Sequence, residues 1–144
     1  MRDGRLMSVG TYPVGEAELH LPAERSQLSL ARRYVRDAAY DHGLDADAGY
    51  ELEYAVNEAV TNAIRHGRPD MRGNIRLTVT SDGERLTVAV HDCGSFTGPH
   101  PCGELSSESA ESGRGLALMA RFVDELQVTS EPGATTVVLS KLRL

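Results

Sequence analysis

A glutamate and an asparagine four residues apart, Glu58 and Asn62, are the residues of this sequence from which a chemical function can first be argued. Apolar residues around them recur at three- and four-residue spacing, which predicts an amphipathic helix from about residue 48 to residue 66. Positions four apart share a helix face, so both polar heads can enter one cleft, the carboxylate as a base and the carboxamide as a metal ligand. The alternative is an ordinary solvated helix edge.

Three further patterns follow in a fixed order. Residues 92–94 read Asp-Cys-Gly after a strand-like run, residues 112–116 read Ser-Gly-Arg-Gly-Leu before an apolar helix, and residues 132–137 read Pro-Gly-Ala-Thr-Thr-Val. Glycines that open a helix leave backbone amides free for an anion, and a guanidinium suits phosphate oxygens. The first two patterns also have an ordinary interpretation, because Asp92 can cap a turn and Arg114 can pair with nearby glutamates.

Taken in order, E-x-x-x-N on a helix, then D-x-G, G-x-G-L and G-x-T-T-V resemble the four boxes of the GHKL superfamily of ATP-binding domains. The stretch N-E-A-V-T-N-A-I-x-H-G is most similar to the anti-sigma factor serine kinases that act on bacterial anti-anti-sigma proteins. The resemblance covers about residues 16 to 142. One box alone is a weak signal, but four in register are a strong one.

The resemblance implies roles for individual residues. Glu58 would orient or deprotonate a serine hydroxyl of a protein substrate, although in other GHKL members the glutamate activates water or contacts a metal-bound water. Asn62 would ligate Mg²⁺ at the phosphates of ATP. Asp92 would bind the adenine amino group and share a water with Thr135. The other implied ATP-binding residues are Arg65, His66, Gly94, Gly113, Arg114, Gly115 and Leu116.

One position departs from the family pattern. Phe96 stands where D-x-G-x-G has its second glycine. Glycine reaches backbone conformations that are closed to other residues, so this change puts the affinity for the nucleotide in question. The same box contains Cys93, and the second cysteine is Cys102; we interpret both as reduced thiols.

The function implied by the resemblance is an ATP-dependent protein serine kinase that is also an anti-sigma factor. It would hold an RNA polymerase sigma factor and phosphorylate a serine of an anti-anti-sigma partner of the STAS type, and the family relationship also implies a homodimer. A binding module that sequesters the sigma factor without catalysis is the alternative, and the glycine lost at Phe96 favours it. A detached histidine-kinase domain is disfavoured, because no phosphoacceptor helix pair is present.

Length and composition agree with one globular domain. The chain has 144 residues, of which 40% are hydrophobic, and a net charge of −6. Such a charge disfavours direct binding to nucleic acid. Apolar segments are far shorter than the roughly 18 residues that a membrane helix needs, so we expect a cytoplasmic protein with no membrane partner.

The elements that must position these residues can be read from periodicity and turn signals. We expect a two-layer α/β sandwich, formally α+β, with a mixed but mostly antiparallel sheet covered on one face by three helices. Residues 1–14 are expected to be a flexible tail, residues 15–144 the ATP-binding domain, and residues 94–112 a lid loop. The expected strands are 16–21, 74–81, 86–90, 127–130 and 135–142, and the expected helices are 23–42, 48–66 and 114–125.

The first expected helix carries four arginines on one side. We interpret this basic face either as a docking surface for a partner, as the resemblance implies, or as a solvated surface. The arginines are Arg25, Arg32, Arg33 and Arg36.

Overall fold

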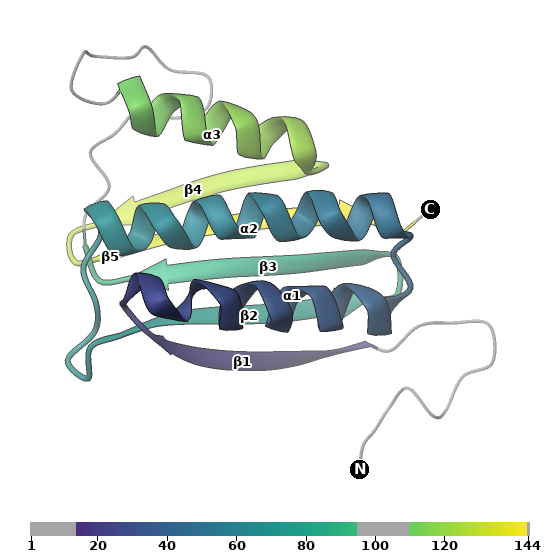
Figure 1. Cartoon of the computed structure of the whole chain (residues 1–144), viewed down its shortest axis with the longest axis horizontal. Helices are drawn as coiled ribbons and strands as arrows, with labels where there is room; N and C mark the ends of the chain where they lie inside the picture. Colours follow the sequence, from purple (N-terminus) through teal and green to yellow (C-terminus); the bar gives the residue numbers. More distant parts are fainter. Residues whose placement is uncertain (1–13, 95–109, 144) are drawn as a thin grey trace.

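The computed structural model describes residues 14–94 and 110–143, and it places them in two layers. Three helices lie side by side over one face of a single sheet (Figure 1). In chain order the elements are β1 (Val14–Pro22), the 3-10 helix η2 (Arg25–Gln27), α1 (Leu28–His42), α2 (Ala46–His66), β2 (Asn74–Asp82), β3 (Arg85–Asp92), α3 (Ala110–Phe122), β4 (Glu125–Glu131) and β5 (Ala134–Leu142). The predicted sandwich with three covering helices is confirmed.

The sheet has the strand order β1-β2-β3-β5-β4, and all four pairings among the described strands are antiparallel. The expectation of a mixed sheet was therefore wrong in detail. Strands β3 and β4 run in the same direction, but β5 lies between them, so they share no hydrogen bonds. Asp92, the last residue of β3, faces Thr135 of β5, which brings two predicted site residues together.

The core lies between the helices and the sheet, as the period-two and helical patterns predicted. The strand residues Ile75, Leu77, Leu86, Val88 and Val90 are almost completely buried. From α2, the apolar stripe buries Leu52, Ala55, Val56, Ala59, Val60 and Ala63. Because this stripe fixes the rotation of α2, the face that carries Glu58 and Asn62 is fixed as well.

Local signals set the ends of α1 and α2. Gly43 ends α1 in the left-handed region, at φ 86°, where glycine has no steric penalty. Asp45 caps α2, because its Oδ1 accepts a hydrogen bond from the amide of Ala48 at 2.8 Å. This cap explains why α2 begins at Ala46, two residues before the predicted start.

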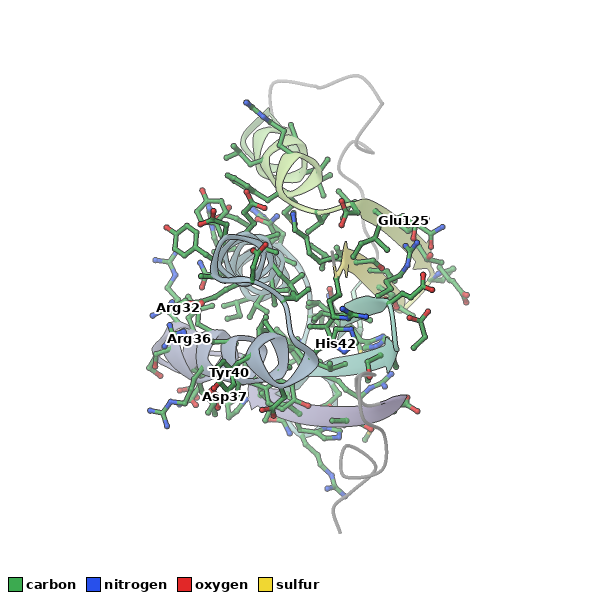
Figure 2. All side chains as sticks on the ribbon, turned by 90° about the vertical axis from the view of Figure 1, so that its right-hand side faces the viewer. Arg32, Arg36, Asp37, Tyr40, His42 and Glu125 are labelled. Atoms are coloured by element: carbon green, nitrogen blue, oxygen red, sulfur yellow. The ribbon has the colours of Figure 1, made fainter. Side chains whose placement is uncertain are left out.

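The basic side of α1 is partly engaged with α2. The Arg32 guanidinium donates to Asn57 Oδ1 at 3.1 Å, and Arg36 donates to both carboxylate oxygens of Glu53 at 3.1 and 2.8 Å. Figure 2 shows these two arginines on the side of α1 that faces away from the sheet, whereas His42 lies between α1 and the sheet. Two of the four predicted docking arginines therefore help to hold the two helices together.

Several sequence predictions fall outside the described part of the chain. They concern the tail up to residue 13, the lid between residues 95 and 109, Phe96 and Cys102. At the edges of these segments the structure differs from the prediction, because Val14 already belongs to β1 and α3 begins at Ala110 instead of Arg114. None of the helices in the described ranges is both long and apolar enough to cross a membrane.

Candidate functional site

An open cavity of about 390 Å³ lies where β3 ends and β5 begins, next to the C-terminal end of α2. Its walls are formed by His66, Gly67, Arg68, Cys93, Gly94 and Gly133. Two of these residues, His66 and Gly94, were predicted from the sequence. Asp92 stands directly before the cavity residues of β3, and Thr135 is its cross-strand neighbour.

The Asp92 carboxylate is held in one orientation by main-chain amides. Its Oδ1 accepts hydrogen bonds from the amide of Gly94 at 2.7 Å and from the amide of Arg68 at 3.3 Å. Within the described ranges, both side-chain hydrogen bonds of Asp92 end on Oδ1, so Oδ2 can accept from a further donor. An exocyclic amine, such as that of adenine, is a donor of the required kind.

The pKa of Asp92 is raised above its ordinary value. Burial is the larger cause, and the hydrogen bonds from Gly94 and Arg68 act in the opposite direction. The carboxylate thus lacks part of the solvation that its charge would have in water. An incoming N–H donor would replace that solvation, which favours binding of an amine-bearing ring at this position.

Two glycines make room for this carboxylate. A Cβ atom at Gly67 would lie 2.6 Å from Asp92 Cγ and 2.7 Å from the carbonyl oxygen of Ala63. At Gly94 it would lie 3.1 Å from Asp92 Oδ1 and 3.2 Å from the amide nitrogen of Arg68. Neither glycine has a positive φ, so conformational freedom does not explain the glycine at either position. Gly67 requires glycine because its neighbours approach so closely, whereas a Cβ at Gly94 would be tightly packed.

Thr135 fixes the loop that follows Asp92. Its hydroxyl donates to the carbonyl oxygen of Gly94 at 2.7 Å, and only 4% of the residue is exposed. This bond ties the end of β3 to the beginning of β5 and so sets one wall of the cavity. The water that Thr135 was predicted to share with Asp92 stays a prediction.

Glu58 and Asn62 lie on α2, earlier in the sequence than the wall residue His66, and do not themselves belong to the walls of the cavity. Asn62 is one helical turn before His66 and Glu58 is two turns before it, about 6 and 12 Å along the helix axis. Both residues are half-buried, which suits side chains at the edge of a site. Arg65 is exposed and also lies outside the walls. The catalytic and metal-binding roles of these residues therefore stay predictions.

The Gly-Arg-Gly segment lies inside α3 and does not open it. Because α3 begins at Ala110, residues 113–115 fall after its first three residues, and the amides of Arg114 and Gly115 belong to the helical hydrogen-bond pattern. Leu116 is 2% exposed and packs in the core with Met119, so its side chain does not form a wall of the cavity. The expected opening of the helix at Gly113 was wrong, because it overestimated how strongly glycine sets a helix boundary.

Sequence reasoning missed Gly67 and Arg68 as cavity residues, and it included Gly133 only as part of the last of the four motifs. It treated Gly67, followed by Arg68 and Pro69, only as the end of a helix. The available signal was a glycine directly after the polar helix face, at a position that can approach another element closely. No cluster of three His, Cys, Asp or Glu residues that could hold a metal occurs in the described ranges.

A match to a known family identifies the domain that contains this site. Residues 21–141 match the model of the histidine kinase-like ATPase domain. The chain belongs to this family. Relatives of this chain are similar to it over most of its sequence. A serine-protein kinase RsbW of Bacillus velezensis is 31% identical over 135 residues, which cover 87% of this chain and 84% of the relative.

An anti-sigma F factor of Thermoanaerobacter sp. (strain X514) is 33% identical over 128 residues, which cover 84% of this chain and 88% of the relative. Among solved structures, the RsbU and RsbW domains of a Mycobacterium tuberculosis protein superpose with a TM-score of 0.68 at 20% identity. That match covers 90% of this chain and 32% of the other. It shows that the histidine kinase-like fold is shared.

Proposed function

We propose that this ATPase-family protein is an ATP-dependent protein serine kinase that also acts as an anti-sigma factor. It would sequester a sigma factor of RNA polymerase and phosphorylate a serine of an anti-anti-sigma partner of the STAS type, in the cytoplasm. The observation that carries the proposal is the Asp92 carboxylate, which accepts on one oxygen from the amides of Arg68 and Gly94, two residues that line the open cavity. Relatives named serine-protein kinase and anti-sigma F factor share this family and most of this length.

The residues at the cavity support binding of an adenine nucleotide. Asp92 Oδ2 is an acceptor for the exocyclic amine, and Gly67 and Gly94 leave space that a Cβ atom would fill. His66 and Arg68 line the same cavity from the end of α2 and the loop that follows it. When bound, ATP with Mg²⁺ supplies the phosphoryl group and the charge screening that phosphoryl transfer requires.

The residues of α2 would serve the transfer itself. Asn62 would hold the cation through its amide oxygen, with the remaining positions left for phosphate and water oxygens. Glu58, one turn earlier, would accept or orient the proton of the serine hydroxyl. Arg65 and Arg114 would bind phosphate oxygens.

The first test replaces the proposed base. Glu58→Gln removes the carboxylate but keeps the size of the side chain, so we expect phosphoryl transfer to fall about a hundredfold or more while ATP binds as before. Transfer is measured with radiolabelled ATP and a candidate STAS protein, and binding is measured by calorimetry. Transfer equal to the wild type would remove Glu58 from the mechanism.

Asn62→Ala separates the kinase from the second candidate function, a sequestering module without catalysis. A kinase requires Mg²⁺-dependent ATP binding that this variant weakens. The noncatalytic module is favoured by Phe96, and it predicts that the affinity for the sigma factor is the same in the wild type, Glu58→Gln and Asn62→Ala. Absence of both ATP binding and transfer in the wild type would select that module.

A further inference from the structure

The loop between α2 and β2, residues 67–73, is an ordered platform beside the cavity. Asp70 organises it, because its Oδ1 accepts from the amides of Arg72 at 2.8 Å and Asn74 at 2.9 Å. The amide of Gly73 also donates to the carbonyl oxygen of Asp70 at 2.9 Å. These amide bonds hold the pKa of Asp70 below its usual range. The loop is thus fixed by internal hydrogen bonds.

The loop is also tied to the rest of the protein at both ends. The amide of Ala23 donates to the carbonyl oxygen of Gly73 at 3.0 Å. The amide of Cys93 donates to the carbonyl oxygen of Arg68 at 2.7 Å, next to the Arg68 amide that contacts Asp92. Its exposed side chains therefore stand at a defined position relative to the nucleotide cavity.

An apolar side chain projects from this platform between two cations. Met71 has a relative exposure of 104%, the largest among the exposed large hydrophobic residues in the described ranges. Arg68 and Arg72 on either side of it in sequence are exposed too. Nothing in the fold gains from a solvated methionine on an ordered loop, whereas methionine and arginine are both enriched where proteins bind other proteins.

The charge of this region is opposite to that of the whole protein. Four arginines and one aspartate lie between residues 65 and 76, which gives that stretch a charge of +3 in a chain of net charge −6. A positive region of this kind attracts acidic surfaces and speeds their encounter. Because it borders the cavity, an acidic protein attracted to it arrives next to the nucleotide.

The phosphates of a nucleotide do not explain the whole platform. Arg68 lines the cavity, but Met71 and Arg72 do not belong to its walls. A thioether has no attraction for phosphate, whereas an apolar centre with a polar rim is typical of a protein-protein interface.

We propose that Arg68, Met71 and Arg72 form a docking platform for the protein whose serine is phosphorylated, and that this protein presents an acidic surface with an apolar recess for Met71. This inference rests on the proposed function, because it names where the substrate of that kinase binds. It adds a surface that begins at the cavity residue Arg68, extends to Met71 and Arg72 outside the cavity walls, and is separate from the helix face of α1.

The test uses the full chain and a STAS-type anti-anti-sigma protein of the same organism, chosen because the wild-type chain phosphorylates it. We compare Met71→Ser, Arg72→Glu and the control Arg121→Glu, which reverses an exposed arginine in the last turn of α3. We expect each platform variant to raise the KM for the protein substrate about tenfold, with kcat unchanged. The control should match the wild type, and calorimetry should give all four proteins the same ATP affinity.

The wild-type KM should also rise with salt, and more steeply than that of Arg72→Glu. An unchanged KM in both platform variants would overturn the docking platform while leaving the kinase intact. Weaker ATP binding by Arg72→Glu would overturn the docking platform as well, because the loop would then serve the nucleotide. Platform variants that lose affinity only for the sigma factor would also overturn it. Failure of the wild type to phosphorylate any STAS protein would instead contradict the proposed function, before any variant is compared.

Discussion

Gly67 has no side chain, yet it is as important for the geometry of the site as the Asp92 carboxylate beside it. Gly67 lets the end of α2 approach Asp92 so closely that the following amide, that of Arg68, can bond to Oδ1. The carboxylate orientation is therefore set by two backbone segments that are far apart in the sequence. A position of this kind is sensitive to a single methyl group.

We expect Gly67→Ala to weaken ATP binding about tenfold or more, because its Cβ would lie 2.6 Å from Asp92 Cγ and displace the carboxylate. Calorimetric titration with ATP and Mg²⁺ measures the effect. Gly73→Ala is the matched control, since a Cβ there meets nothing within 4 Å although its φ of 83° adds backbone strain. An affinity for ATP that is lowered equally in both variants would show that loop strain, and not the contact with Asp92, is responsible.

At the residue scale, the sequence predicted which residues meet better than it predicted how closely the backbone approaches them. The strand before Asp92 follows from alternating apolar residues, and the resemblance implied that Thr135 lies near Asp92, so their proximity was predictable. The role of Gly67 was not, because a glycine after a helix has the same sequence signature whether it ends the helix or accommodates a neighbour. Only the tertiary packing distinguishes the two.

Among the elements, α3 is held most visibly at its C-terminal end. Lys141 of β5 donates to the carbonyl oxygen of Phe122 at 2.8 Å and to Glu51 Oε1 of α2 at 2.7 Å. The Phe122 ring also meets Tyr54 of α2 edge to face, with ring centroids 5.0 Å apart. One ammonium group thus joins three elements and satisfies a carbonyl group at the end of a helix.

Lys141→Met should lower the free energy of unfolding by about 1–3 kcal/mol, because a mostly buried cation with two acceptors is lost while the volume is kept. Urea unfolding followed by circular dichroism gives the value. Arg36→Met is the matched control, since it removes a pair in which the arginine is 62% exposed, and its effect should be smaller. Equal losses in the two variants would contradict a special role of Lys141.

The elements themselves were largely predictable, with errors at their ends. Alternating residues gave the strands, and the apolar stripe gave α2. The start of α3 was missed because Gly113 and Gly115 have low helix propensity, yet packing of Leu116 and Met119 carries the helix past them. The one-turn 3-10 helix at Arg25–Gln27 was included in the predicted first helix, since three polar residues have no periodicity that could distinguish it from an α-helix.

For the molecule as a whole, a buried histidine makes stability depend on pH. His42 is 3% exposed at the end of α1. Burial lowers its pKa, the charge of Arg143 lowers it further, and Asp82 acts in the opposite direction. The unfolded chain therefore binds a proton more readily than the folded one. Stability from this source is complete above the ordinary histidine pKa of about 6.5 and is lost as the pH falls below it.

We expect the free energy of unfolding to decrease between pH 7.5 and pH 5.5, and His42→Leu to reduce that decrease. Part of the dependence should remain, because burial also lowers the pKa of His91. Urea unfolding at several pH values tests this, with exposed His66→Gln as the control that should behave like the wild type. A pH profile unaltered by His42→Leu would show that this histidine does not titrate on unfolding.

The pairing of β1 has a consequence for the order in which the molecule assembles. The hairpins β2–β3 and β4–β5 join neighbouring segments, but β1 pairs with residues 52 to 68 positions further along, from Pro22 with Asn74 to Val14 with Asp82. Local contacts close faster than distant ones. The edge strand β1 can therefore pair only after α1, α2 and β2 have been synthesised. Synthesis must pass residue 82 before all of β1 can form its hydrogen bonds with β2.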